Sequence, residues 1–418
     1  MFSGMFVHSL LFFVCDLFRI PLNATSMYIT LVAGALAMAP LWKSTLACLR
    51  HLRTVQPVNI RLYDLPVIGF SGYVFYMIIW ASWYWPVTPF DAMAGIDLVA
   101  KYVVKDGTIV NSVFSNASLS GQLSNQPFYA PHAMLMQSIM KLLGFTYNQI
   151  WVGISSVAFS ILIWAVLRQL AHPLIASILY LIFLLTPEMF GYTYLLQTDY
   201  INAVYTAIGV YLVWQGVEQK DRSHVLASIV FFAGACWSRT ESPLLIVIGC
   251  SLGLFYMLRA FGRFDSLRLT LGIVGSSVVV FALWNVLFMN FYLPVRPSTS
   301  EQLQGFDVTK YLEVFQATFE SVVMRFDLWG IVVWMFAVVI IASLLVYRRL
   351  TPAPLLLWIV SIILGLTVVG TVFSAAVVEQ TIRRGMFKAI PLMVLAIAGS
   401  QLVTSASARL GAWESKRV

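Results

Sequence analysis

The chain has 418 residues, of which 60% are hydrophobic and only 11% are charged, with a formal net charge of +8. A soluble domain carries about 25% charged residues, so this composition excludes an ordinary soluble protein and predicts that most of the chain lies in lipid. The basic residues fall mainly in short segments between apolar runs, and membrane topology explains them better than nucleic-acid binding does.

Apolar runs of about 17–25 residues recur along the whole chain, and a helix is the natural spanning element for each of them. The sequence therefore predicts an all-α polytopic membrane protein, with residues 1–418 forming a single integral membrane domain. About twelve transmembrane helices are expected, at residues 5–22, 25–48, 64–86, 148–168, 172–190, 198–216, 224–239, 241–259, 268–292, 327–347, 353–375 and 386–406.

Alternate loops carry the basic residues, as expected of loops on the cytoplasmic side. These residues are Lys43, Arg50, Arg53, Arg61, Arg168, Lys220, Arg222, Arg259, Arg263, Arg268, Arg348, Arg349, Arg409, Lys416 and Arg417. Both termini are then predicted to be cytoplasmic. The external face receives the polar segments 86–147, 190–199, 293–326 and 376–385, together with the turn 239–241.

The first external loop, residues 86–147, is far longer than the usual connection of about 4–6 residues, and loops of this length are more often functional. Within it, residues 97–105 and 133–143 have the pattern of amphipathic helices that lie on the membrane surface. The second external loop, residues 293–326, is expected to lead into another surface helix. These loops point to a function on the non-cytosolic face.

Asp91 follows Pro86 and Pro89, which end the third predicted span. A carboxylate held there beneath surface helices would be partly desolvated, and its pKa would rise toward that of a useful general base. The alternative is a solvated aspartate that caps a helix at residues 92–104.

Asp199 begins the predicted span 198–216, where it either caps the helix, in competition with Thr198, or serves a site. Arg239 and Glu241 occupy the turn between two short spans. Because residues two apart do not share a helix face, these two side chains are expected to point to different partners. A charged pair in an external turn favours a functional role.

Glu379, Arg383 and Arg384 precede the last predicted span, and Lys388 lies one turn further in. External cations at a helix start oppose both the positive-inside trend and the helix dipole. An anionic partner would resolve this conflict, and phosphate suits paired guanidinium groups. Anionic lipid headgroups are the alternative partner.

The sequence favours no cofactor. His132 is the only histidine of the first external loop, and the chain has no Cys/His cluster, which argues against structural zinc. A divalent cation held by Asp91 and Asp199 stays open as an alternative.

Five stretches follow one another in a fixed order. They are Asp91-Ala92-Met93 with Leu98-Val99-Ala100-Lys101; Asn125-Gln126-Pro127-Phe128-Tyr129-Ala130-Pro131, running to Lys141-Leu142-Leu143-Gly144; Gln197-Thr198-Asp199-Tyr200-Ile201; Gly234 through Arg239-Thr240-Glu241-Ser242; and Arg383-Arg384 followed by Pro391. In order and membrane side they resemble the GT-C superfamily of polytopic glycosyltransferases, closest to its bacterial branch related to protein mannosyltransferases and lipid A sugar transferases.

The chain departs from the pattern of this superfamily in three places. Gly95-Ile96 replaces the usual aromatic residue, Ile201 replaces a proline, and residues 125–127 lack the His-x-Asp. These departures bear on donor or acceptor recognition, and on activity itself.

The resemblance implies a hexosyl- or pentosyl-type transferase that moves a sugar from a polyprenyl-phosphate donor to a hydroxyl of a lipid, glycan or protein acceptor. It implies a bacterial inner-membrane protein whose active site faces the periplasm. Asp91 would be the general base, and Arg239, Arg383 and Arg384 would bind the donor phosphate. The residues that would bind or orient substrate are Asp97, Lys101, Tyr129, His132, Asp199, Glu241 and Glu379.

Three other functions fit the same pattern. A lipid-linked saccharide flippase would carry polar or broken helices at the midplane, whereas the charges here crowd one face. A glycan polymerase or ligase would share the polyprenyl donor, and a non-catalytic subunit of a glycan-assembly complex would bind it without turnover. Trp83, Tyr84 and Trp85 would form an interfacial aromatic belt or stack on a sugar.

Overall fold

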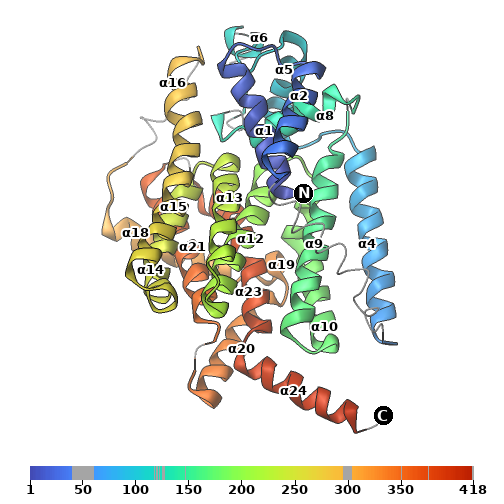
Figure 1. Ribbon diagram of the computed structural model, residues 1–418, viewed down its shortest axis with the longest axis vertical. Coiled ribbons are helices and arrows are strands. Elements are labelled where there is room, and N and C mark those ends of the chain that lie inside the picture. Colours follow the sequence, from blue (N-terminus) through green and yellow to red (C-terminus); the bar gives the residue numbers. More distant parts are fainter. Residues whose placement is uncertain are drawn as a thin grey trace. The chain divides into compact units, whose positions relative to one another are not determined.

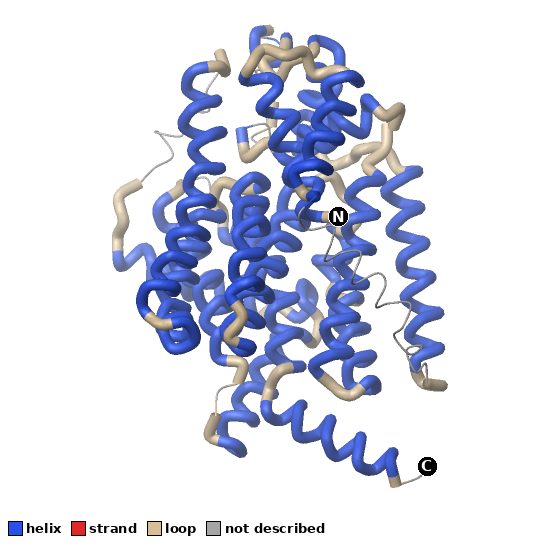
Figure 2. The backbone as a smooth tube through the Cα atoms, viewed as in Figure 1, coloured by secondary structure: helices blue, strands red, loops and turns tan. Residues whose placement is uncertain are grey.

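A computed structural model describes residues 1–39, 61–116, 118, 121, 123–124, 128–145, 147–294, 304–349, 351–374 and 376–416. Every regular element in these ranges is a helix (Figure 2). The all-α prediction is thereby confirmed for the part of the chain that the structure describes.

The longer apolar helices follow the predicted spans closely. In chain order the α-helices are α1 (Phe2–Leu17), α2 (Ala24–Ala37), α4 (Asp64–Tyr84), α5 (Leu98–Asp106), α6 (Ser112–Ser115), α8 (His132–Leu142), α9 (Ile150–Leu170), α10 (Pro173–Leu184), α11 (Pro187–Tyr192), α12 (Thr198–Gln219), α13 (Arg222–Ser238), α14 (Ser242–Phe261), α15 (Arg263–Ala282), α16 (Met289–Phe291), α18 (Val308–Thr318), α19 (Phe326–Trp329), α20 (Val332–Tyr347), α21 (Ala353–Val372), α22 (Arg383–Gly385), α23 (Ala389–Ala398) and α24 (Gln401–Ser415). Shorter π- and 3₁₀-helical turns are η1 (Ala92–Asp97), η3 (Leu283–Phe288), η4 (Phe319–Val323), η5 (Val378–Ile382) and η6 (Met386–Lys388).

Five helices of the described chain are long and apolar enough to cross a membrane. They are Asp64–Tyr84, Ile150–Leu170, Ser242–Phe261, Arg263–Phe291 and Ala353–Val372. A sixth results if the bent pair Val378–Ala398 and Gln401–Ser415 is counted as one span. The protein is therefore helical with five to six candidate membrane spans.

The number of twelve spans is not reached among the described residues, because the other helices at the predicted positions are shorter or more polar. α1 has 16 residues and is about 24 Å long, less than the hydrocarbon core of about 30 Å. Lys43, Arg50 and Arg53, in the second predicted span and the loop after it, lie outside the described residues.

The last predicted span, residues 386–406, is bent in the structure and stays a candidate span. α23 ends at Ala398, and α24 begins at Gln401 after a bend of 48°. The Ser400 side chain accepts a hydrogen bond from the Val403 backbone N–H at 3.3 Å and so caps α24. This cap lets the chain change direction where the apolar helix α23 gives way to the more polar helix α24.

The described residues group into two compact units. The first holds the described residues of Met1–Ile154, Tyr194–Gln197 and Phe291–Val295, and the second those of Ser155–Thr193, Thr198–Asn290 and Arg296–Val418. The single integral domain stays a prediction.

In the first unit α8 is the central helix and packs against α1, α2 and α5 (Figure 1). Its residues 132–139 are all buried. Neighbouring helices thus cover both faces of the amphipathic helix α8, and its predicted position on the membrane surface stays a prediction. α5 keeps an exposed face, as predicted, and Lys101 lies on it.

In the second unit α12 is the central helix and packs against α13, α14, α21 and α23. All of its residues from 198 to 210 are buried, as expected of a helix covered on every side. α13 in turn packs on α15, and α14 packs on α15 and α21. This packing gathers polar residues from three parts of the sequence near the N-terminus of α12.

Candidate functional site

Seven charged side chains of the second unit form a chain of five ion-paired residues and one further ion pair, Glu188 with Arg383, and we call this set the charge cluster. Its members come from the start of α11, the start of α12, the turn between α13 and α14, and the segment that leads into α23. They are Glu188, Asp199, Arg239, Glu241, Arg383, Arg384 and Lys388.

The turn between α13 and α14 presents Arg239 and Glu241 to the cluster. α13 ends at Ser238, and Arg239 continues with an extended backbone. Pro243 is in the first turn of α14, a position where the missing N–H of proline costs nothing. The Asn202 amide fixes the turn to α12, because its Nδ2 donates to the Ala235 carbonyl at 2.7 Å and to Ser242 Oγ at 2.8 Å.

Arg239 lies at the centre of the cluster with 5% of its side chain exposed. Its Nη1 is 3.0 Å from Asp199 Oδ1, and its Nε donates to both Glu241 oxygens at 3.0 and 3.1 Å. Nη1 also donates to Thr198 Oγ1 at 3.1 Å. Arg239 and Glu241 have different further partners, Asp199 and Lys388, as expected, and they also pair with each other across the turn.

Glu241 is shared by two cations. Lys388 Nζ, which is fully buried, lies 3.1 Å from Glu241 Oε1, although the two residues are 147 positions apart in the chain. Burial raises the pKa of the Glu241 carboxyl, but Arg239 and Lys388 outweigh it and lower the pKa to about 2. Glu241 is therefore ionised and serves as the anchor for both cations.

Asp199 is fully buried and lies between two arginines. Arg239 Nη1 is 3.0 Å from Oδ1, and Arg384 Nη1 is 3.7 Å from Oδ2. Neither carboxylate oxygen accepts a hydrogen bond, and the Arg384 nitrogen is too distant for one. Asp199 is thus held between two cations by charge and not by directed hydrogen bonds.

The partly exposed end of the cluster consists of Arg383 and Arg384, whose side chains are 34% and 17% exposed. Arg383 Nε lies 3.1 Å from Glu188 Oε1, and Arg384 Nε donates to the Gln380 carbonyl at 3.2 Å. Gly385 allows this segment to approach α21, because a Cβ at this position would overlap the Leu366 side chain. The two guanidinium groups are the cations of the cluster nearest to solvent.

Tyr192, at the end of α11, was not predicted from the sequence. Burial raises the pKa of its phenol, and the charges of Arg384, Asp199, Glu188 and Arg383 also act on it. Its ring packs edge-on against Phe387 with 4.8 Å between centroids. No pattern in the sequence distinguishes this tyrosine from the other aromatic residues of the chain.

The cluster has more positive than negative charge. Four basic side chains face three carboxylates, and three of the cations, Arg239, Arg384 and Lys388, surround Asp199 and Glu241. Anions are stabilised where cations are held in a partly desolvated position. The arrangement can therefore bind one further negative group at the side of Arg383 and Arg384.

Asp91 lies in the first unit and is half-buried. It stands at the N-terminus of η1, but its side chain makes no capping hydrogen bond there. Its backbone carbonyl accepts a hydrogen bond from Ser124 Oγ at 3.0 Å. The simple capping role considered for Asp91 is therefore wrong, and the role of general base stays a prediction.

Asp97 belongs to a second polar network, also in the first unit. Lys141 Nζ lies 2.8 Å from Asp97 Oδ1, and Gln137 Nε2 donates to the same oxygen at 2.8 Å. Gln137 in turn donates to the Asn148 carbonyl at 3.1 Å and accepts from Trp151 Nε1 at 2.9 Å. Asp97 thus joins α5, α8 and the start of α9.

The remaining candidates are scattered. His132 is fully buried, with Nδ1 2.9 Å from Ser9 Oγ, and burial lowers its pKa to about 3. Tyr129 is half-buried, while Lys101 and Glu379 are exposed. The described contacts of His132 are internal, and substrate contacts for these four residues stay predictions. Residues 125–127 of the second motif lie outside the described chain.

The charge cluster does not fit a divalent cation, because Asp199 faces two arginines. Among the described residues, no three His, Cys, Asp or Glu side chains are grouped so that they could hold a metal ion. In the comparisons with known proteins, the chain shows no significant match to a family model, a curated protein or a solved structure.

Replacement of Glu241 by glutamine is expected to remove stability that depends on pH. The pKa of this carboxyl is 4.5 without its partners and about 2 in the folded protein, so the unfolded chain binds more protons between these values. The stabilisation is complete above 4.5 and is lost as the pH falls toward 2.

Measured free energies of unfolding of wild type and Glu241→Gln should therefore converge below pH 4.5. A difference that stays constant across this range would contradict the assignment of an ionised Glu241.

Proposed function

We propose that this protein is a GT-C type glycosyltransferase with about twelve spans, which transfers a sugar from a polyprenyl-phosphate donor to an acceptor hydroxyl on the non-cytosolic membrane face. The observation that carries the proposal is the charge cluster of the second unit. The cluster has one more positive than negative charge, and most of it is buried. Its arginine pair, Arg383 and Arg384, is partly exposed and so suits the phosphate group of a membrane-borne donor.

The phosphate is proposed to bind to Arg383 and Arg384. Both side chains are partly exposed, while Arg239 and Lys388 are held by buried carboxylates and add positive potential from behind. Charge-assisted hydrogen bonds from guanidinium groups to phosphate oxygens are about twice as strong as neutral ones. They would be strongest when the phosphate leaves with its full charge, so they favour the transition state over the bound donor.

In the proposed reaction the acceptor oxygen attacks the anomeric carbon while Asp91 takes its proton. The bond between the anomeric carbon and the phosphate oxygen breaks, and the electron pair leaves with the polyprenyl phosphate. Asp91 belongs to the first unit and the arginines to the second, so each role is tested by its own variant. Asp199 and Glu241 are proposed to orient the arginines.

Binding of polyprenyl phosphate tests the role of the arginine pair. In nanodiscs, the double variant Arg383→Gln/Arg384→Gln is expected to bind a short-chain polyprenyl phosphate at least about tenfold more weakly than wild type. The uncharged polyprenol should bind both proteins equally. The matched control is Arg348→Gln/Arg349→Gln, which removes two adjacent exposed arginines of the same unit and should leave the affinity unchanged.

Two outcomes would overturn the proposed phosphate site. One is equal binding of polyprenyl phosphate by wild type and the double variant. The other is displacement by phosphatidylglycerol at the same concentration as polyprenyl phosphate, which would make the arginine pair a general contact for anionic lipid headgroups.

A further inference from the structure

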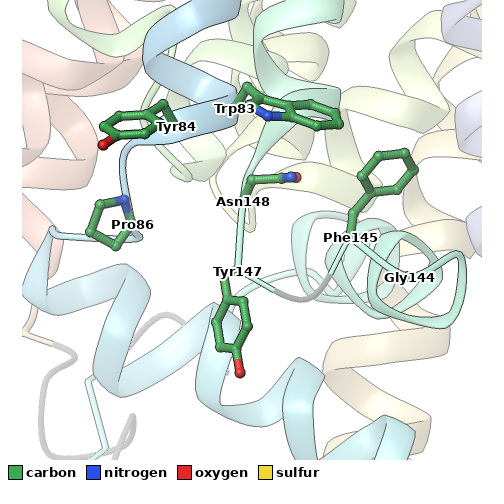
Figure 3. A pocket seen from close by; sticks show the side chains of 7 residues that line it. All are labelled: Trp83, Tyr84, Pro86, Gly144, Phe145, Tyr147 and Asn148. Atoms are coloured by element: carbon green, nitrogen blue, oxygen red, sulfur yellow. The ribbon is translucent and has the colours of Figure 1, made fainter.

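A hollow of about 430 Å³ opens in the first unit at the end of α4. It is lined by Trp83, Tyr84, Pro86, Gly144, Phe145, Tyr147 and Asn148 (Figure 3). None of these residues belongs to the charge cluster, and none carries a charge. We call this feature the aromatic hollow.

The two chain segments that form the aromatic hollow are fixed to each other. The Gln149 backbone N–H donates to the Ser82 carbonyl at 2.9 Å, which joins the end of α4 to the start of α9. Gln137 is fully buried, and its Nε2 donates a hydrogen bond to the Asn148 carbonyl at 3.1 Å. Gly144 has a φ of +94°, which lets the chain turn sharply after α8. These hydrogen bonds hold the two walls of the hollow together.

An apolar groove continues from the aromatic hollow along α4. It has a volume of about 440 Å³ and is lined by Phe75, Tyr76, Ile79, Trp80 and Trp83. Trp83 belongs to both sites. Because α4 is one of the candidate membrane spans, the groove faces a place where a hydrocarbon chain is the natural neighbour.

The side chains of the hollow select for a particular headgroup. The Asn148 amide points between the Trp83 and Phe145 rings (Figure 3), and Trp83 is 53% exposed. An aromatic face next to an amide suits a sugar ring, whose C–H face packs on the aromatic ring while its hydroxyls bond to the amide. The absence of charged lining residues disfavours a phosphate or a carboxylate, whose burial needs a partner.

A quaternary ammonium headgroup fits less well. Such a cation needs several aromatic faces turned toward one point. Here Trp83 and Phe145 meet edge-on with 5.6 Å between their centroids, and the Tyr147 ring points away from them (Figure 3). The rings therefore do not close into a cage.

We propose that the aromatic hollow and the groove beside it bind a membrane lipid with an uncharged sugar headgroup. The sugar ring lies against Trp83 and bonds to Asn148, and the hydrocarbon tail follows α4. This site lies wholly in the first unit and does not rest on the proposed function, so each can fail while the other stands.

The test uses the full chain in nanodiscs of phosphatidylethanolamine and phosphatidylglycerol, prepared without alkyl-glycoside detergent because such a detergent would occupy the site. The probe is monoglucosyl-diacylglycerol with a photoreactive group in its acyl chain. We expect crosslinking to peptides of α4, and displacement by unlabelled monoglucosyl-diacylglycerol at about tenfold lower concentration than by diacylglycerol. Phosphatidylcholine should compete no better than diacylglycerol.

Two variants separate the headgroup from the tail. Trp83→Leu should weaken capture about tenfold, and Asn148→Leu should abolish the preference over diacylglycerol while capture itself persists. The matched control is Trp413→Leu on α24, because this tryptophan is 52% exposed, nearly as much as Trp83. Since Trp83 is exposed, its replacement is not expected to unfold the protein, and circular dichroism checks this.

Three results would overturn the proposal. Equal displacement by diacylglycerol and its glucosyl derivative would mean that the headgroup is not recognised. Stronger displacement by phosphatidylcholine would assign the hollow to a cationic headgroup. Equal loss of capture in Trp83→Leu and Trp413→Leu would indicate a general effect of exposed tryptophan.

Discussion

Replacement of Arg239 by methionine is expected to lower the free energy of unfolding by about 3–5 kcal/mol, because it leaves buried carboxylates without their main counter-charge. Asp199 is fully buried and Glu241 is 10% exposed, and both lie within 3.1 Å of the Arg239 side chain. The loss is measured by denaturant unfolding of the detergent-solubilised protein. It should be largest near neutral pH, where Glu241 is ionised, because the pKa of this carboxyl is about 2 in the folded protein.

The matched control for Arg239→Met is Arg325→Met. Arg325 also pairs its guanidinium with a carboxylate, since its Nη2 lies 2.6 Å from Asp327 Oδ2. Both of these side chains, however, are more than half exposed. Exposed ion pairs contribute little to stability, so this variant should unfold as wild type does. Equal effects of the two substitutions would mean that the charge cluster does not hold the second unit together.

Replacement of Asp91 by asparagine is expected to reduce the rate of sugar transfer by about 10²–10⁴-fold, the contribution of a positioned general base. Asparagine keeps the size of the side chain, but its amide cannot take the proton from the hydroxyl of the acceptor. Donor affinity should stay unchanged, because the phosphate is proposed to bind to Arg383 and Arg384. Initial rates and donor binding are measured on the same nanodisc preparation.

Asp106→Asn is the control for Asp91→Asn. Asp106 lies in the same unit at the end of α5, and its carboxylate accepts hydrogen bonds from Ser112, which lower its pKa. This variant changes the same chemical group without touching the proposed base. If Asp91→Asn keeps the wild-type rate, Asp91 is not the base of this reaction.

Much of the fold could be predicted from the sequence, because apolar runs determine where helices form in such a chain. The turn at residues 239–241 and the start of α12 fall within one residue of their predicted positions. The bend at Gly399 and Ser400 was missed, although the sequence becomes more polar from α23 to α24. The signal was the serine cap of α24, a local hydrogen bond that hydropathy does not detect.

Burial was harder to predict than helix position. The amphipathic pattern of α8 identifies an apolar face, but it does not tell whether water, lipid or another helix covers the opposite face. In the structure α1 and α5 pack on α8, so His132 and Gln137 are fully buried. These contacts join segments up to 123 residues apart, as between Ser9 and His132, and no spacing rule predicts them.

The charge cluster was predicted in its parts and not as a whole. Arg239, Glu241, Arg383 and Arg384 stood out because charges are costly in an apolar chain. Their pairing was not predictable, because it depends on α12 lying between α13 and α23. The link between Lys388 and Glu241 crosses 147 residues, and no pattern in the sequence predicts such a contact.

The most direct test of the proposed transferase is sugar release by the wild-type protein in nanodiscs. The substrates are a panel of radiolabelled polyprenyl-phosphate sugars, offered with acceptors from a membrane extract. The account predicts that one sugar moves from one donor to the acceptor and that polyprenyl phosphate is released in equal amount. Transfer of a whole glycan chain, or movement of the lipid-linked sugar across the bilayer without release, would contradict it.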